Sequence, residues 1–200
     1  MNKSKMFNLN KCFKNNIIAL REEDKSLLLY SKTLNNKNGN FKKDGISNIY
    51  EKNLHYIIYK ALMSIGDCLV YMEENYRNCK GKCDITLDTL DEKKTLWLEI
   101  KLIGSRENWI NINGYKRWLK NDIKKLQGLP KDEKHKYYLL TWAEKNKPDK
   151  FKWKRRLEKH LVGIKFIPSL FNFFKTTFYD YEKKEGIKDG YYVVCLLKVL

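Results

Sequence analysis

The stretch Lys82–Ile103, KCDITLDTLDEKKTLWLEIKLI, decides the fold of this chain. Two strand-like segments, Lys82–Leu90 and Thr95–Ile103, flank the short polar run Asp91–Lys94. A polar break between two such segments is typical of a β-hairpin. Because side chains two apart in a strand share a face, the hairpin would separate its charged residues from its apolar ones.

The register of this hairpin determines which polar side chains meet. A turn centred on residues 92–93 would place Asp84 opposite Lys101 and Thr86 opposite Glu99. We therefore expect one face to carry the polar set and the other face to enter the core. The polar set is Asp84, Thr86, Asp88, Glu99 and Lys101, and the apolar set is Leu98, Ile100 and Leu102.

The polar set has the chemistry of a metal-dependent hydrolase. Asp84 and Glu99 could hold Mg²⁺, with the Ile100 carbonyl as a further oxygen, because Mg²⁺ takes oxygen ligands and needs only one or two carboxylates. The ion would polarise a phosphate and lower the pKa of an attacking water. Lys101 would orient or deprotonate that water, or stabilise developing negative charge. The alternative is an exposed hairpin with an ordinary cross-strand ion pair.

Outward from the hairpin, the pattern predicts an α/β fold. A helical stripe begins near the expected N-cap Ser47 and runs to about Ile65. The further expected elements are strands at Cys68–Tyr76, Tyr137–Trp142 and Tyr191–Leu200 and helices at about Tyr115–Leu126 and Lys152–Leu161. One or two short helices are expected within Ile17–Tyr30, followed by a loop at Leu34–Lys43.

Asp84, the triplet Glu99-Ile100-Lys101 and the expected order of elements, α-β-β-β-α-β, resemble the PD-(D/E)xK, or restriction-endonuclease-like, nuclease superfamily. The resemblance covers most of the chain from Ser47 to Trp142. It implies a central mixed β-sheet flanked by helices, with extra N-terminal and C-terminal elements, Mg²⁺ dependence (Mn²⁺ as a substitute) and phosphodiester hydrolysis. It assigns Asp84 and Glu99 as metal ligands and Lys101 as the catalytic lysine. Cys83 stands where the family pattern has proline.

Glu51 is a further candidate for the catalytic set. It falls within the apolar arc of the helix after Ser47, where an unpaired carboxylate is costly, and many members of the family supply an extra metal-site acid from this helix. Alternatively, Glu51 lies in the first helical turn, where negative charge is favourable. We interpret His55, one turn later, as a boundary residue rather than a ligand. One of Glu73 and Glu74, which point to opposite faces of their strand, could be a reserve ligand.

The formal net charge of +17 predicts a polyanionic partner. Basic residues cluster with Trp118, Phe151 and Trp153, a combination that suits phosphate contact and base stacking. A lysine-rich solvated surface is the alternative. The residues expected to contact nucleic acid are Lys116, Arg117, Lys124, Lys125, Lys152, Lys154, Arg155 and Arg156. Lys125 or Gln127 could also approach the metal centre.

We expect residues 1–43 to form an N-terminal helical and loop extension and residues 44–200 the nuclease-like domain, within one compact molecule. The five cysteines fit a reducing compartment, the N-terminus lacks a signal peptide and no apolar run could span a membrane, so we expect a cytoplasmic protein. Cys79-x₃-Cys83 lacks the partners of a zinc site. Neither a P-loop nor a serine-hydrolase elbow occurs.

Three hypotheses follow. The first is a Mg²⁺-dependent endonuclease that cleaves DNA, of a restriction-like or repair/junction type, acting as a homodimer because two strands require two sites. The second keeps the fold and the chemistry but takes RNA as substrate. The third is a non-catalytic nucleic-acid-binding module, which would bind with steep salt dependence and without Mg²⁺.

Overall fold

This computed structural model describes residues 9–38, 51–66, 68–76, 80–89, 95–103, 113–130, 135–144, 146–180 and 185–200. Within these ranges, two helices and three strands are followed by a helix, a strand, a helix and two strands. The elements are α1 (Leu9–Asn38), α2 (Glu51–Met63), β1 (Cys68–Asn75), β2 (Lys82–Thr89), β3 (Thr95–Ile103), α3 (Asn113–Gln127), β4 (His135–Glu144), α4 (Lys150–His160), β5 (Phe166–Asp180) and β6 (Glu185–Val199). None of the described helices is long and apolar enough to cross a bilayer.

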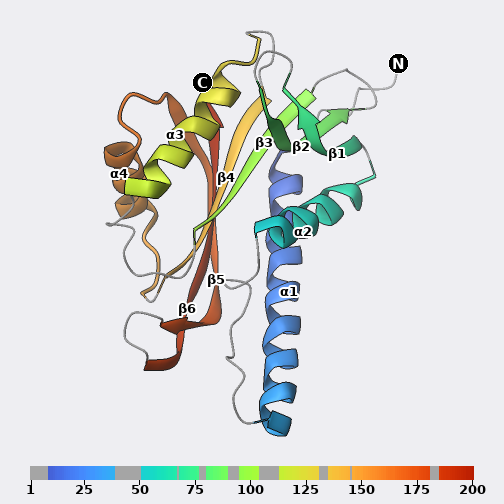
Figure 1. Ribbon diagram of the computed structural model, residues 1–200, viewed down its shortest axis with the longest axis vertical. Helices are drawn as coiled ribbons and strands as arrows, with labels where there is room; N and C mark the ends of the chain where they lie inside the picture. The colour runs from blue at the N-terminus through green and yellow to red at the C-terminus, as the bar shows by residue number, and fades with distance from the viewer. Residues whose placement is uncertain are drawn as a thin grey trace.

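The six strands form one mixed sheet in the order β1-β2-β3-β4-β6-β5 (Figure 1). β1, β2 and β3 are an antiparallel meander, whereas β4 runs parallel to β3. A parallel pair needs a crossover, and α3 supplies it. β6 and β5 complete the sheet with antiparallel pairing. The expected α/β class, with a mixed sheet flanked by helices, is therefore confirmed.

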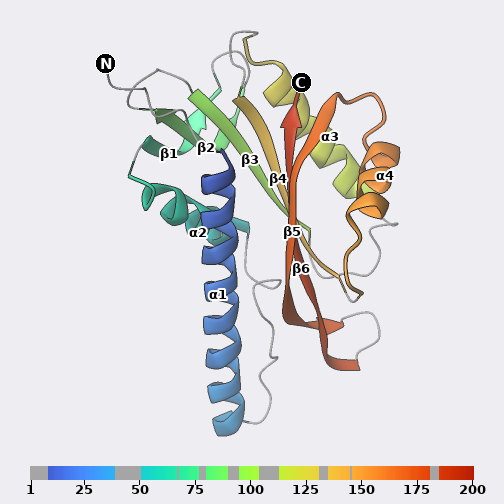
Figure 2. The same cartoon turned by 180° about the vertical axis from the view of Figure 1, so that it is seen from behind.

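The helices cover both faces of the sheet. α1 and α2 lie on one face, and α3 and α4 lie on the other (Figures 1 and 2). Each face has its own apolar core. The α1/α2 core includes Leu20, Leu54, Ile58, Leu98 and Ile100, and the α3/α4 core includes Trp97, Ile123, Tyr138, Trp153 and Leu157. Leu98, Ile100 and Leu102 thus enter the opposite layer from Trp97, as the hairpin pattern predicts.

The register of the hairpin differs from the prediction by two residues. Asp88 pairs with Thr95 and Thr86 with Trp97, whereas a turn centred on residues 92–93 would place Thr86 opposite Glu99. A shift of two keeps every side chain on its face, so the apolar alternation cannot distinguish the two registers. The expected turn at residues 91–94 lies outside the described part of the chain.

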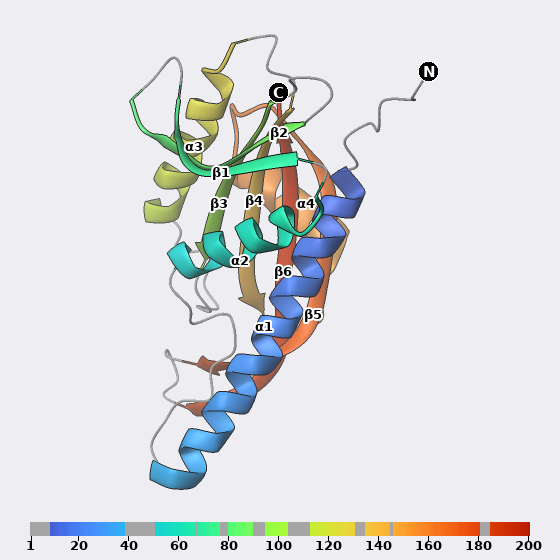
Figure 3. The same ribbon diagram turned by 90° about the vertical axis from the view of Figure 1, so that its right-hand side faces the viewer.

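The expected helical structure within Ile17–Tyr30 is present, but the predictions of short helices there and of a loop at residues 34–38 are wrong. α1 is one continuous helix through residue 38, and it lies along the sheet beside β5 (Figure 3). Its Phe13, Ile17 and Leu20 side chains belong to the same core as α2. This packing stabilises a long helix, although the polar stretches of its sequence alone do not predict one. The remaining predicted loop residues and Ser47 lie outside the described ranges.

At the C-terminal end, β5 is an element that the sequence pattern did not indicate. Its residues 166–180 mix Phe with Lys, Asn and Pro168, because an edge strand tolerates proline and exposed polar side chains. The predicted strands at Tyr137–Trp142 and Tyr191–Leu200 are confirmed as parts of β4 and β6, and the two predicted helices as α3 and α4.

Candidate active site where the β2–β3 ladder opens

Asp84 marks the point at which the ladder between β2 and β3 opens. The last paired residues are Ile85 and Leu98. Beyond them, the backbone N–H of Ile100 donates to Oδ2 of Asp84 at 2.7 Å. A side-chain oxygen thus satisfies a backbone donor of β3 that would otherwise need a ladder partner, and the Asp84 carboxyl is held between the two strands.

The backbone is irregular on the other side of β2 as well. Glu73, in the neighbouring strand β1, has a φ of 54°, in the left-handed region that side chains other than glycine rarely adopt. Cys83 and Ile85 stand two apart in β2, yet they lie in different cores. The alternation of β2 therefore reverses at Asp84, which lets its carboxyl approach side chains from both faces.

Glu99 is the second carboxyl of the site. It is buried in β3, lies close enough to the Asp84 carboxyl for the two groups to shift each other's pKa, and accepts a hydrogen bond from the Tyr76 hydroxyl. Burial and the adjacent charge of Asp84 raise the pKa of Glu99 from 4.5 to about 9. At neutral pH the pair therefore shares one proton, since two adjacent buried carboxylates cannot both ionise without a cation.

His55 of α2 approaches the other oxygen of Asp84, with Nδ1 at 3.5 Å from Oδ1. Burial raises the pKa of Asp84, and the nearby His55 and the Ile100 N–H partly offset that rise. The His55 Nε2 atom is buried and has no hydrogen-bond partner among the described residues. The interpretation of His55 as a mere boundary residue therefore misses its contact with the site.

Lys101 is held by Glu51 at the N-terminal end of α2. The Lys101 ammonium donates to Oε1 of Glu51 at 2.9 Å, and the Leu102 backbone N–H donates to Oε2 at 3.2 Å. On its other side the ammonium lies 5.7 Å from the centre of the Trp118 ring, within the range of a cation–π contact. The Glu51 carboxylate thus binds β3, and its charge also acts on Asp84.

α3 brings a second ion pair to the site. Nζ of Lys125 donates to Asp122 at 3.0 Å. Burial alone would lower the pKa of Lys125, but the hydrogen bond to Asp122 and the charges of Asp122, Glu99 and Asp84 raise it. The prediction that Lys125 approaches the centre is consistent with this electrostatic contact. Gln127 instead donates to the Leu200 carbonyl at 3.3 Å.

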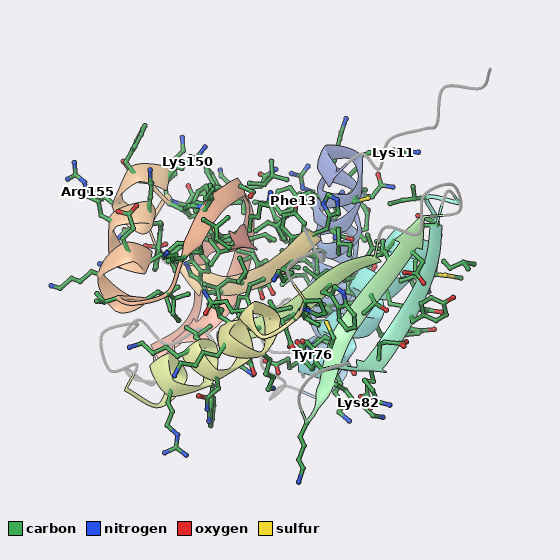
Figure 4. All side chains as sticks on the ribbon, turned by 90° about the horizontal axis from the view of Figure 1, so that it is seen from above. Lys11, Phe13, Tyr76, Lys82, Lys150 and Arg155 are labelled. Atoms are coloured by element: carbon green, nitrogen blue, oxygen red, sulfur yellow. The ribbon has the colours of Figure 1, made fainter. Side chains whose placement is uncertain are left out.

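The other predicted nucleic-acid contacts lie on the α3/α4 face. Arg117 and Lys124 are exposed on α3, as are Lys152, Lys154, Arg155 and Arg156 on α4; the Lys116 side chain lies outside the description. Figure 4 shows Arg155 of α4 pointing away from the sheet. The Arg156 guanidinium lies 5.1 Å from the centre of the Trp153 ring.

The two carboxyls fit a hard divalent cation. Asp84 and Glu99 come from different strands, interact electrostatically, and carry a proton that a cation could replace. Mg²⁺ is usually bound through one or two carboxylates, with water and substrate phosphate completing its shell. Among the described side chains, no group of three or more His, Cys, Asp and Glu residues is arranged to hold a metal ion. An ion here would therefore take its other ligands from backbone, solvent or substrate.

Other candidate residues do not join this cluster. Glu73 and Glu74 are both exposed on β1, and Glu73 pairs with Lys52 and Lys82 at 3.9 and 3.7 Å, so neither acid joins the buried carboxyls. Cys83 is buried, with its thiol against the carbonyls of Ile85 and Leu98, and burial raises its pKa. Cys79 lies outside the described residues.

Tyr76 and Asp122 are site residues that the sequence reasoning missed. Tyr76 ends a predicted strand and Asp122 lies within a predicted helix. Neither position carries a local sequence pattern that indicates contact with the carboxyl pair. No family model, curated protein or solved structure matches the chain. Any assignment of function therefore depends on the geometry around Asp84 and Glu99.

Proposed function

We propose that the chain is a metal-dependent endonuclease of the PD-(D/E)xK type. The observation that carries the proposal is the position of two interacting carboxyls, Asp84 bound to the Ile100 N–H and the buried Glu99, at the opening of the β2–β3 ladder. A sheet with an antiparallel meander, a helical crossover and a parallel fourth strand agrees with this interpretation. A net charge of +17 favours a polyanionic substrate.

Each residue of the site has a distinct role in this proposal. Asp84 and Glu99 would hold the ion, with the Ile100 carbonyl as a further oxygen, and Glu99 would hold it in its deprotonated form. Mg²⁺ or Mn²⁺, when bound, polarises the scissile phosphate and lowers the pKa of the attacking water. Lys101, which Glu51 holds in place at 2.9 Å, donates to a phosphate oxygen and stabilises the negative charge that develops there.

Tyr76 and His55 act as positioning residues. The Tyr76 hydroxyl donates a hydrogen bond to Glu99, which fixes one oxygen of that carboxyl and leaves the other for the ion. His55 restrains Oδ1 of Asp84. Groups that hydrogen-bond to metal ligands in this way fix their orientation and commonly affect metal affinity.

DNA is the substrate class we propose, and RNA is the alternative, because the exposed basic side chains of α3 and α4 would contact the phosphates of either polymer. Cleavage of both strands of a duplex would require two copies of the site, which favours a homodimer. Incubation with plasmid DNA, branched DNA and structured RNA, each with Mg²⁺ or Mn²⁺, distinguishes the substrates.

The decisive experiment compares site variants with a surface variant. Asp84→Asn, Glu99→Gln and Lys101→Met should each abolish cleavage of the preferred substrate while the far-UV circular dichroism stays unchanged. Glu74→Gln removes an exposed carboxylate from β1 and should leave cleavage unchanged. Cleavage at the unmodified rate in all three site variants would refute the assignment.

A non-catalytic nucleic-acid-binding module is the second candidate. The observation that favours it is the set of exposed basic side chains on α3 and α4, which would contact phosphates whether or not the carboxyl pair binds a metal. Such a module would bind nucleic acid with steep salt dependence and without Mg²⁺. Titration calorimetry with Mn²⁺ separates the two: heat that is lost in Asp84→Asn supports the enzyme, and no heat with the unmodified protein supports the module.

A further inference from the structure

A groove between α4 and the edge strand β5 lies apart from the carboxyl pair. Its volume is about 260 Å³, below the roughly 300–1,000 Å³ of pockets that take drug-sized ligands. Helix α4 and strands β5 and β6 supply its walls. The lining residues are Lys150, Phe151, Trp153, Lys154, Leu157, Ile167, Pro168, Leu170, Phe171 and Cys195.

The walls of the groove are aromatic and partly exposed to solvent. Phe151 is 75% exposed and Ile167 is 50% exposed. Beneath them, Trp153 is buried and packs on Trp142, with ring centres 4.4 Å apart. Exposure of a phenylalanine to this extent costs free energy, so its position beside a preformed apolar groove indicates a surface that an apolar, planar group would cover.

The rim of the groove is strongly basic. α4 has the sequence KFKWKRRLEKH, in which Glu158 is the one acidic residue. Two of its lysines, Lys150 and Lys154, line the groove itself, and Arg155 of the same helix points outward (Figure 4). An apolar slot bordered by cations suits a molecule that joins a flat apolar part to negative charges.

A nucleotide with an unpaired base has this combination. Proteins that bind single-stranded nucleic acid stack bases on aromatic side chains and contact the backbone with Lys and Arg. A base-paired duplex encloses its bases in the stack, so it can offer this groove phosphates alone. α4 lies on the same face of the sheet as α3 (Figure 2), whose Trp118 and Lys125 border the candidate active site.

We infer that the α4/β5 groove binds an unpaired base of the nucleic-acid substrate, with Phe151 stacked on the base and Lys150 and Lys154 on the adjoining phosphates. The substrate is then a single strand, or a duplex with a flap, overhang or loop. The inference rests on the proposed function for its choice of a polynucleotide. The groove shares no residue with the carboxyl pair, so binding in EDTA tests it independently of cleavage.

The test is fluorescence anisotropy of the full chain in EDTA with three labelled DNA probes of equal length. These are a single strand, the same strand with abasic sites in place of its nucleotides, and a blunt duplex. We expect the single strand to bind on the order of ten-fold more tightly than the abasic strand, the size of effect that one stacked base provides. Phe151→Ala should remove this preference.

Val162→Ala is the matched control, because Val162 is 70% exposed and does not line the groove; it should bind all three probes as the unmodified protein does. A strand with 2-aminopurine should report stacking by a loss of its fluorescence, and Phe151→Ala should restore that fluorescence. Equal binding of the normal and abasic strands, or unchanged binding by Phe151→Ala, would overturn the inference.

Two further outcomes are informative. Asp84→Asn should bind the single strand as tightly as the unmodified protein. Its cleavage therefore tests the proposed function, and its base preference tests the groove separately. Bis-ANS should fluoresce in the groove and be displaced by the single strand. If the dye binds there, loses binding in Phe151→Ala, and is not displaced, the groove takes a different class of molecule and the inference is wrong.

Discussion

The carboxylate of Asp84 accepts a hydrogen bond from the backbone N–H of Ile100 at 2.7 Å. This contact holds a charged group between two strands where the next ladder bond would otherwise form, and it brings Asp84 against Glu99. The cost is a buried pair of carboxyls. Proteins retain such unfavourable pairs where function requires them, because perturbed carboxyl groups concentrate at functional sites.

Asp84→Asn should separate metal binding from stability. The asparagine oxygen can still accept from the Ile100 N–H, while the like charge beside Glu99 is lost, so the thermal midpoint should stay the same or rise. Binding of Mn²⁺ in titration calorimetry should disappear, since one of the two carboxylate ligands is gone. Glu74→Gln, an exposed carboxylate change on β1, is the control for both measurements. Undiminished Mn²⁺ binding by Asp84→Asn would contradict the assignment.

Glu99→Gln should change the pH dependence of stability. Between pH 4.5, the ordinary pKa of the carboxyl in the unfolded chain, and about 9, its pKa in the folded protein, the folded state keeps a proton that the unfolded state has lost. Stability from this group therefore falls as the pH rises through that interval. The glutamine mimics the protonated form and should abolish this fall. Urea denaturation at pH 5, 7 and 9 measures it.

A saturating divalent cation should flatten the same profile in the unmodified protein, because the ion replaces the shared proton. If the unmodified protein and Glu99→Gln lose the same stability between pH 5 and 9, the carboxyl pair does not share a proton in that range.

Thr176→Val should weaken the attachment of α1 to the sheet. The Thr176 hydroxyl donates to the Asp24 carboxylate at 2.7 Å, and both side chains are buried. Loss of one hydrogen bond to a buried charged group should cost about 1–3 kcal/mol of unfolding free energy. Urea denaturation of Thr176→Val, Asp24→Asn and the double variant measures the coupling between the residues. Additive effects of the two single changes would show that this bond contributes no coupling energy.

The sequence predicted the parts of the fold that have a strong local pattern. The alternation at Leu98, Ile100 and Leu102 and the helical stripe at Leu54 and Ile58 identify elements whose apolar faces do reach one core. The register of the hairpin was missed by two residues, since both registers bury the same side chains. β5 was missed because an edge strand with Pro168 and exposed polar residues has little periodicity.

The site was predicted less completely than the sheet. Asp84 and Glu99 meet as expected, but they meet because β2 reverses its alternation at Asp84, which a regular strand pattern cannot predict. The expected direct approach of Lys101 to Asp84 is replaced by its ion pair with Glu51. Tyr76 and His55 reach the carboxyls through the tertiary fold alone, so no local pattern could have indicated their contacts.

Glu51→Gln tests whether the ion pair with Lys101 positions the ammonium for chemistry. The Glu51 carboxylate binds both the Lys101 ammonium and the Leu102 N–H, so the amide should keep the backbone contact and lose most of the hold on Lys101. We expect cleavage to fall by roughly 10–100-fold, the usual effect of changing a group that orients an active-site residue. Glu22→Gln, which breaks an exposed pair with Lys25 at 2.7 Å, should leave cleavage unchanged.

A double variant makes the positioning role of Glu51 specific. If Glu51 acts through Lys101, the variant Glu51→Gln/Lys101→Met should cleave no more slowly than Lys101→Met alone, because the group that Glu51 orients is already absent. A further loss in the double variant would mean that Glu51 acts directly on the metal or the substrate. In that case Mn²⁺ affinity should also fall in Glu51→Gln. A purely positioning carboxylate should leave that affinity unchanged, because among the described contacts neither Asp84 nor Glu99 takes a hydrogen bond from Glu51.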